Sequence, residues 1–302
     1  MLDYHRMLLA DAKRTLAFRE ALRRVVKADD VVVDLGSGSG MLAFFAAEAG
    51  ARKVFAIERG HMADVIAVLA KQFRVGDRVE VLHENSEKVE LPERGSVLVS
   101  EILGTFGLQE EILSMTIDAR ARLLAPNATI IPSRVVLSAV PVELSYDYDK
   151  HVAWWSGDHY GFDLSPLRMF ASNGLFTADI PEKTHLARPA EIIDVHLATV
   201  DDSTVTGKAS FDVTRDGTLH GFGGWFTATL ADDVTLSNEE AFATHWQQTF
   251  LPLEQPVEVT SGTRVELELQ SHDGRAWRWR GRAGETEFDQ ATGLSSPPCT
   301  RI

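Results

Sequence analysis

The 302-residue chain contains 44% hydrophobic and 25% charged residues, which is the composition of a soluble globular protein long enough for two domains. Its formal net charge of −14 argues against a protein that binds the nucleic-acid backbone, and no apolar stretch approaches the roughly 18 residues of a membrane span. The single cysteine, Cys299, excludes a disulfide framework within the chain, the N-terminal stretch "MLDYHRMLLADAKRT" lacks the apolar core of an export signal, and no His/Cys cluster has metal-ligand spacing, so we expect a cytoplasmic protein without a metal.

The first part of the chain alternates helical and strand patterns. Residues 6–27 have helical periodicity, and "DDVVVDLGSGSGMLAFFAAEAGARKVFAIERG" has the pattern of strand, Gly-rich turn, helix and strand. The segments "VEVLHEN" and "GSVLVSE" are two further strands, and "EEILSMTIDARARLLAP" is a helix that we expect Pro126 to end. Because "VVVDL" is a β-branched run suited to a strand buried on both faces, this alternation predicts an open α/β sheet.

The pattern changes near "NATIIPSRVVLSAVPVEL", and the domain boundary is expected near Pro132–Ser133. From there short alternating strands predict an antiparallel barrel or sandwich: "AEIIDVHLATV", "TVTGKASFDVT", "GFGGWFTATL", "PVEVTSGTRVELELQSH" and "RAWRWRG". Within the last strand, alternation places Trp277 and Trp279 on the core face and the neighbouring arginines outside. Residues 160–180 are an exception, because they have an apolar and helical pattern.

The Gly-rich turn follows the first strand and favours a cofactor that carries a nucleoside. Gly36, Gly38 and Gly40 allow a ligand to approach the backbone closely, but Met41 stands where a dinucleotide fingerprint has its third glycine. The spacing therefore favours S-adenosylmethionine (SAM). Glu58, twenty-two residues after Gly36 at the end of the next strand, is placed to accept hydrogen bonds from both ribose hydroxyls.

The stretch "SEILGTFGLQEEIL" places acidic residues at both ends of an otherwise apolar loop. Taken alone, Glu101 and Glu110 are ordinary acids at a strand end and a helix start, where acids are favourable. Acidic residues are also in excess over the whole chain, and most of this excess lies in its second part. Residues through Val135 carry 18 Lys and Arg against 19 Asp and Glu, whereas the rest carries 12 against 25, which suits a cationic ligand.

Together these segments resemble the protein arginine methyltransferases, the SAM-dependent class with a Rossmann-type domain and a β-barrel. "HRMLLADAKRT" is similar to the family's first cofactor helix, "VVVDLGSGSGMLAFFAAEAGARKVFAIE" to its glycine motif and "SEKVELP" to its adenine segment. "SEILGTFGLQEEIL" resembles the double-glutamate loop, "THWQQTFLPLE" the Thr-His-Trp loop and "YGFDLS" the start of the dimerisation arm. The resemblance implies a SAM-binding domain over residues 1–132, a β-barrel substrate domain over 133–302 and a dimerisation arm over 160–190.

The resemblance also implies residue roles for the cofactor. His5 and Arg14 would face the cofactor, with Arg14 holding its carboxylate. The turn against its methionine part would be shaped by Asp34, Gly36 and Gly38. Glu58 would accept the ribose, and Glu87 would accept the adenine amino group.

For the substrate, the resemblance implies that Glu101 and Glu110 form the paired acids of an arginine pocket, which His245 and Trp246 close. His245 or one of the acids would accept the departing proton. Glu111 lies outside the motif and is interpreted as a surface or supporting residue.

Two departures keep alternatives open. The family's Tyr-Phe-x-x-Tyr stretch before the first helix is not matched by "MLDYH", and "SEILGT" replaces its usual Ser-Glu-Trp-Met-Gly-Tyr. The expected function is therefore an arginine N-methyltransferase acting on a peptide or protein as a homodimer. A methyltransferase of free arginine or a small guanidino metabolite is the first alternative, and a non-catalytic SAM-binding scaffold is the second.

Overall fold

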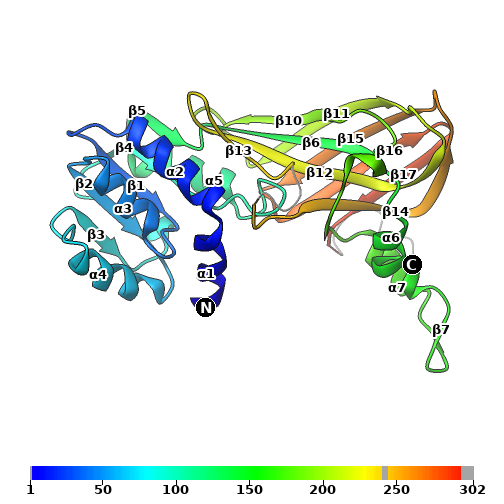
Figure 1. The fold of residues 1–302 in the computed structure, drawn as a ribbon, viewed down its shortest axis with the longest axis horizontal. Coiled ribbons are helices and arrows are strands. Elements are labelled where there is room, and N and C mark those ends of the chain that lie inside the picture. Colours follow the sequence, from blue (N-terminus) through cyan, green and yellow to red (C-terminus); the bar gives the residue numbers. More distant parts are fainter. Residues whose placement is uncertain (1, 240–243, 294–302) are drawn as a thin grey trace.

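The computed structural model describes residues 2–239 and 244–293, and its two kinds of sheet lie at opposite ends of the molecule (Figure 1). A parallel sheet with its helices forms one end. Antiparallel sheets form the other end, and from them project a short helical segment and a hairpin of β7 (Asp158–His159) and β8 (Phe162–Asp163) (Figure 1). The predicted α/β sheet followed by antiparallel strands is confirmed at this level.

The parallel sheet has the strand order β3-β2-β1-β4-β5 among the described residues. The central strand is buried along its whole length, as its β-branched sequence predicts. Along the chain its strands are β1 (Val31–Leu35), β2 (Lys53–Ile57), β3 (Val79–Leu82), β4 (Gly95–Val99) and β5 (Leu124–Ile131). The helices of this part are α1 (Leu2–Ala10), α2 (Ala12–Val25), α3 (Met41–Glu48), α4 (Met62–Gln72), the 3₁₀ turn η1 (Ser86–Lys88) and α5 (Ile112–Arg122).

Two helix boundaries differ from the sequence prediction. The single helix expected over residues 6–27 is two helices, because Asp11 has a non-helical backbone and its carboxylate accepts the Arg14 N–H as the N-cap of α2. The helix expected to continue to Pro126 ends at Arg122. Pro126 instead lies in β5, where residues 124–131 pair with β4.

The antiparallel part consists of two main sheets in the described chain. The first has the order β10-β6-β12-β14-β9, with β13 paired to β12, and the second has the order β11-β15-β16-β17. The strands of the first sheet are β6 (Arg134–Val142), β9 (Phe176–Ala178), β10 (Ala190–His196), β12 (Gly217–Ala231), β13 (Val234–Ser237) and β14 (Gln248–Val259). Those of the second are β11 (Thr204–Asp212), β15 (Arg264–His272), β16 (Ala276–Ala283) and β17 (Thr286–Ala291).

The inner faces of these two sheets form one apolar core. Trp277 and Trp279 are buried, with exposed fractions of 3% and 0%, as the alternation in "RAWRWRG" predicts. Arg278 and Arg280 on the opposite face pair with Asp289 and Glu268. Closure of the sheets into a barrel stays a prediction.

Residues 145–173 form a projecting segment between β6 and β9 (Figure 1). The helical pattern expected over 160–180 is only partly right, because residues 158–163 form a two-stranded hairpin and 176–178 belong to β9. The segment consists of α6 (Ser145–His151), η2 (Ala153–Trp155), β7 (Asp158–His159), β8 (Phe162–Asp163) and α7 (Leu167–Ser172), and the short turn η3 (Glu182–Thr184) follows β9. In the part of the chain that is described, no helix is both long and apolar enough to cross a membrane.

Candidate active site

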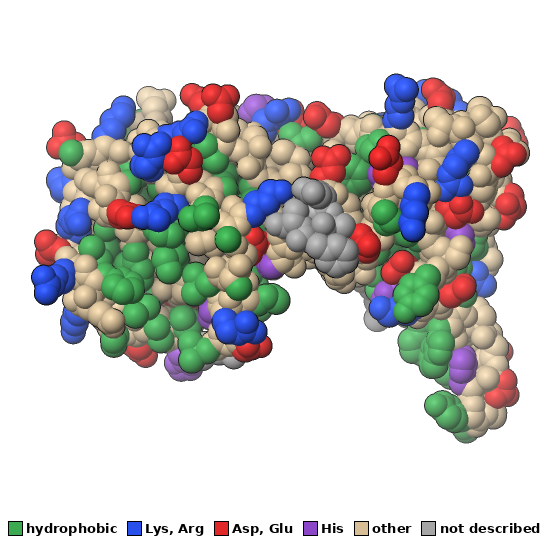
Figure 2. Space-filling view, in the orientation of Figure 1, with side chains coloured by type: hydrophobic (Ala, Val, Ile, Leu, Met, Phe, Trp, Pro, Cys, Tyr) green, Lys and Arg blue, Asp and Glu red, His purple; other side chains and the backbone are tan. Residues whose placement is uncertain are grey.

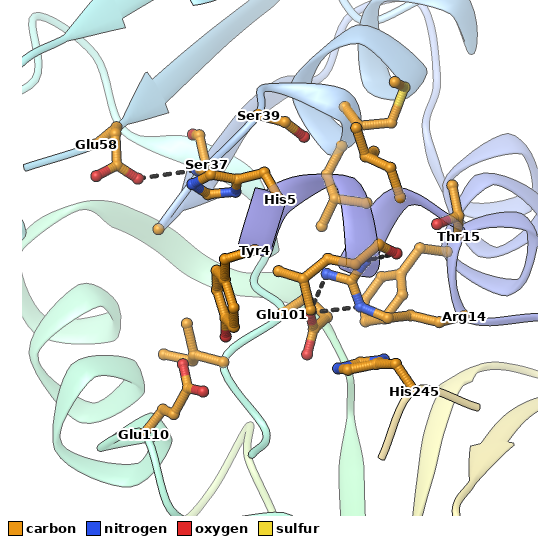
Figure 3. Close-up of a pocket in the computed structure, with 18 of the residues that line it drawn as sticks. Tyr4, His5, Arg14, Thr15, Ser37, Ser39, Glu58, Glu101, Glu110 and His245 are labelled. Atoms are coloured by element: carbon orange, nitrogen blue, oxygen red, sulfur yellow. Dashed lines mark hydrogen bonds and ion pairs between the residues drawn. The ribbon is translucent and has the colours of Figure 1, made fainter. Parts of the chain in front are cut away.

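A cavity of about 330 Å³ opens where the first two helices, the Gly-rich turn and two loops meet. Its walls include both an acid-rich part and an apolar part, as the pocket close-up shows (Figure 3). It brings together nine residues that sequence analysis singled out: His5, Arg14, Gly36, Gly38, Glu58, Glu101, Glu110, His245 and Trp246.

The Gly-rich turn presents its backbone to the cavity. Gly36 and Gly38 have φ angles of 76° and 52°, a left-handed conformation that glycine adopts without strain. A Cβ atom on Gly38 would lie 3.2 Å from the His5 ring, and one on Gly36 would lie 3.2 Å from Ile102. The turn is therefore packed between α1 and the acid-rich loop. Its N–H groups are bonded within the protein, because those of Gly36 and Ser37 donate to the Ile57 carbonyl and that of Gly38 donates to Glu58.

Glu58 is fixed at the end of β2 by both of its carboxylate oxygens. Oε2 accepts the Gly38 N–H at 2.9 Å (Figure 3). Oε1 accepts the Gly60 N–H at 2.6 Å. Since a carboxylate has about four acceptor positions, two hydrogen bonds leave capacity for a diol. The role of Glu58 as the ribose acceptor stays a prediction.

Asp34 lies behind the turn and outside the cavity lining. Its side chain is completely buried, Oδ2 accepts the Ala43 N–H at 3.0 Å, and Oδ1 has no hydrogen-bond partner among the described residues. Burial raises the pKa of Asp34 to about 7. Its place beneath the first turn of α3 gives it a supporting role for the Gly-rich turn.

The two acids of the loop face the cavity from different directions (Figure 3). Glu101 Oε2 accepts hydrogen bonds from Arg14 Nε, at 2.6 Å, and from Arg14 Nη2, while Arg14 Nη1 donates to the Leu8 carbonyl. Arg14, which is predicted to hold a cofactor carboxylate, therefore also forms a direct ion pair with Glu101. Partial desolvation, and then the negative charge of Glu101, raise the pKa of Glu110.

His245 reaches the cavity from the loop before β14 and is held by Asp11. Asp11 Oδ2 accepts the His245 backbone N–H at 2.7 Å and lies 2.8 Å from His245 Nδ1. Burial would raise the pKa of Asp11, but hydrogen bonds from Arg14 and His245 outweigh it and lower the pKa. Because a carboxylate only accepts, the His245 Nδ1 beside Asp11 carries a proton.

Trp246 closes the cavity on the side of the antiparallel domain. It is 6% exposed, its ring lies 4.1 Å from that of His245, and its edge meets Phe226 of β12 at 5.1 Å. The Thr-His-Trp loop is thus anchored in the core of the second domain, while its His245 and Trp246 line the cavity beside the first domain.

Sequence reasoning missed two residues of this site. Asp11 was not singled out, although its position before an amphipathic helix is typical of an N-cap. Tyr4 lines the cavity between Glu110 and Glu101 (Figure 3). Desolvation, and then the charges of Glu110 and Glu101, raise the pKa of Tyr4. The spacing of Tyr4 and Leu8, one helical turn apart, was the available signal.

Two further acids lie outside the cavity. Glu87 is exposed on η1 and is not among the residues that line the cavity, so its predicted contact with adenine stays a prediction. Glu111 forms an ion pair with Arg275 Nη2 at 2.5 Å, which links the acid-rich loop to the turn between β15 and β16. The interpretation of Glu111 as a supporting residue agrees with this contact.

Comparisons with known proteins cover both parts of the chain. Residues 134–282 match the family model described as "Arginine methyltransferase oligomerization subdomain", and residues 15–140 match "Ribosomal protein L11 methyltransferase (PrmA)". Protein arginine N-methyltransferase 6 of Danio rerio is 33% identical over 281 residues, which are 88% of this chain and 80% of that protein. Protein arginine N-methyltransferase 2 of Homo sapiens is 31% identical over 297 residues, 92% of this chain and 68% of that protein.

Solved structures have the same fold. Protein arginine methyltransferase 10 of Arabidopsis thaliana, described as a uniquely open conformation, superposes with a TM-score of 0.80 at 25% identity and covers 97% of each chain. The PRMT1 enzyme-prozyme heterotetrameric complex with AdoHcy of Trypanosoma brucei superposes with a TM-score of 0.87 at 22% identity, over 97% of this chain and 98% of that chain. Both superpositions cover nearly the whole chain.

Proposed function

Because this chain belongs to the protein arginine N-methyltransferase family, we propose that it transfers a methyl group from SAM to a guanidino nitrogen of arginine in a peptide or protein. The observation that carries this proposal is the convergence of Glu101, Glu110 and His245 on one cavity beside the Gly-rich turn. Arginine offers a planar cation with donors on two edges, and two carboxylates are matched to it.

The residues around the Gly-rich turn fit SAM. Gly36 and Gly38 line the cavity and have no side chain to keep the methionine part of SAM away, and Glu58 has acceptor capacity for the two ribose hydroxyls. Arg14 keeps unused N–H donors after its bonds to Glu101 and Leu8, so it can hold a carboxylate as well. Bound SAM supplies a methyl group on a positively charged sulfonium.

The acid pair orients the substrate for attack. One carboxylate can pair bidentately with one edge of a guanidinium, and two hold both edges and fix its plane. They also draw positive charge toward the nitrogens they hold, which leaves the target nitrogen more nucleophilic. Holding it at near-attack distance supplies much of the rate in reactions of this kind.

His245 is placed to take the proton that the reaction releases. With SAM bound, its methyl group would move to the target nitrogen and its sulfur would keep the electron pair of the broken carbon–sulfur bond. The methylated nitrogen then becomes acidic and loses a proton. His245 Nε2 can accept that proton, because Nδ1–H is already directed at Asp11 and a carboxylate stabilises the resulting imidazolium.

The experiment that tests the function is a methyl-transfer assay with labelled SAM and purified protein. The substrates are an arginine-rich peptide, the same peptide with lysine in place of arginine, and free arginine, and products are identified by mass spectrometry. Methylation of the arginine peptide alone is the expected result. Methylation of free arginine alone would transfer the function to a small guanidino metabolite, and binding of SAM without transfer to any of them would favour a scaffold.

The projecting segment supports assembly as a homodimer. Several large apolar side chains of this segment are exposed, and Figure 2 shows hydrophobic surface along it: Tyr146, Trp154, Tyr160, Phe162, Leu167 and Phe170. Exposed apolar surface of this kind marks an interaction site. A second copy of the chain supplies a matching surface, because helices α1, α2 and α4 of the first domain also expose Leu2, Leu16 and Val68. The segment is then the dimerisation arm, docked on the first domain of its partner around a two-fold axis.

A further inference from the structure

One buried amide connects the two loops that form the arginine pocket. Asn238, just after β13, has an exposed fraction of 0%. Its Nδ2 donates to the Thr105 carbonyl and to the Gln247 carbonyl, both at 2.8 Å, and its Oδ1 accepts the Phe226 N–H at 2.8 Å. Thr105 lies between Glu101 and Glu110, and Gln247 directly follows Trp246, so one side chain reaches both loops.

The short carboxamide side chain of asparagine matches all three hydrogen-bond partners. Two backbone carbonyls need two N–H donors and one backbone N–H needs an acceptor, which is the inventory of a carboxamide. An aspartate would set a carboxylate oxygen against two carbonyl oxygens. A leucine would leave three buried backbone groups without partners, and unpaired buried polar groups are costly.

Strand β12 lies next to Asn238 and contacts both loops. Phe226 of β12 contacts Trp246 through its ring and Asn238 through its backbone. A Cβ atom on Gly107 of the acid-rich loop would lie 2.7 Å from the Phe226 Cβ, and one on Gly224 would lie 2.6 Å from the Phe106 ring. The acid-rich loop is therefore packed directly against β12 at these two glycines.

From these contacts we infer that Asn238 is a positioning residue that sets the separation between the acid pair and His245. The inference rests on the proposed function, because it assigns Asn238 an effect on methyl transfer through backbone atoms of both loops. The residue itself does not line the cavity. Since a displacement of about 1 Å at a reacting centre costs on the order of 100-fold in rate, loss of this link affects turnover more than it affects SAM binding.

The test compares Asn238→Asp and Asn238→Ser with Val265→Ala, a core variant in β15 that removes buried volume away from both loops. Melting temperature, the Kd for SAM, and kcat and KM for the arginine peptide are measured, well below the melting temperature of every variant. Asn238→Asp should lower kcat by about 10- to 100-fold with the Kd for SAM within about threefold. Val265→Ala should lower the melting temperature with kcat nearly unchanged. Asn238→Ser, which is smaller and uncharged, is measured in the same way if Asn238→Asp does not fold.

A second readout does not depend on turnover. The bond from His245 Nδ1 to Asp11 protects that proton from exchange with water, and its NMR signal reports the position of the Thr-His-Trp loop. Faster exchange in both Asn238 variants and not in Val265→Ala supports the inference. Unchanged exchange together with kcat within twofold of the wild type would overturn it. A wild-type protein that methylates no arginine substrate refutes the proposed function alone, and the exchange measurement then decides the role of Asn238.

Discussion

Glu110 and its neighbour Glu111 have the same charge but opposite settings. Glu110 faces the cavity beside Glu101 and Tyr4, whereas Glu111 pairs with Arg275 outside it. We expect Glu110→Gln to lower kcat for the arginine peptide by at least about 100-fold, because the change keeps the shape of the side chain and removes one charge from the guanidinium clamp. Single-turnover kinetics with labelled SAM measure the effect, and the Kd for SAM should stay within a few fold.

Glu111→Gln is the matched control, since it alters the adjacent residue by the same atoms. Its kcat should remain within a few fold of the wild type because an exposed ion pair contributes little. Equal losses in the two variants would show that the Glu110 effect is one of loop structure and not of the clamp.

The buried carboxyl of Asp34 predicts a pH-dependent stability. Its pKa in the folded protein, about 7, lies above the ordinary aspartate pKa of 3.8, so the folded state favours the protonated form. Such a group costs stability as pH rises through this interval, and the cost is fully present above pH 7. Asp34→Asn does not titrate, so its stability relative to the wild type should be higher at pH 8 than at pH 5, by roughly 2–3 kcal/mol. Thermal denaturation of both proteins at the two pH values measures the difference, and a difference that is the same at both would contradict the burial argument.

The secondary structure of the projecting segment decides which variants can test its role in dimerisation. Removal of residues 163–177 would take away part of β9, which pairs with β14 in the first antiparallel sheet. A single substitution at the exposed tip avoids this damage. Phe162 is 71% exposed in β8, so a charge there should not unfold the chain.

Phe162→Glu should convert a dimer into a monomer at micromolar concentration, because a carboxylate in an apolar contact loses hydration without gaining a partner. Light scattering gives the mass, and activity should fall with the dimer fraction. Phe162→Tyr keeps the ring and should remain a dimer. A fully active monomer would show that methyl transfer does not depend on dimerisation through this segment.

Element types were largely predictable from sequence, whereas helix ends were not. The continuous apolar run "VVVDL" is a fully buried strand, and the alternating pattern "RAWRWRG" is a strand with one buried face. Both were assigned correctly. Asp11 interrupts a pattern that is otherwise continuous for helix, and its cap depends on a local backbone angle that periodicity does not record. Pro126 was expected to end a helix but lies in β5, which pairs on one side with β4.

The site was predictable where residues lie in recognisable loops and not where contact depends on the meeting of distant segments. Glu101, Glu110 and His245 were identified from their motifs. The pairing of Asp11 with His245 spans 234 positions in the chain, and that of Asn238 with Thr105 spans 133. Neither pairing has a local sequence signal, because both arise from the packing of one domain against the other.

At the scale of the whole molecule, the acidity is concentrated after Val135, where 25 Asp and Glu face 12 Lys and Arg. A long basic peptide should feel this field, and salt should screen it beyond a Debye length of about 8–10 Å. We therefore expect KM for an arginine-rich peptide to rise steeply between 50 mM and 500 mM salt while kcat changes little. A short neutral peptide with one arginine is the comparison. Equal salt dependence for the two peptides would show that the acidic field has no part in substrate binding.

Asp11 performs two tasks with one carboxylate, and this has a consequence for heat inactivation. Oδ1 caps the first turn of α2 and Oδ2 holds His245, while the preceding helix α1 has no fully buried residue. Helix ends fray at lower temperature than cores unfold. Fraying of this turn would release His245 while both sheets remain intact. Activity should therefore decline several degrees below the cooperative melting transition seen by near-ultraviolet circular dichroism, and it should return on cooling. The working temperature of the enzyme is then set by a single turn of helix and not by the stability of its domains.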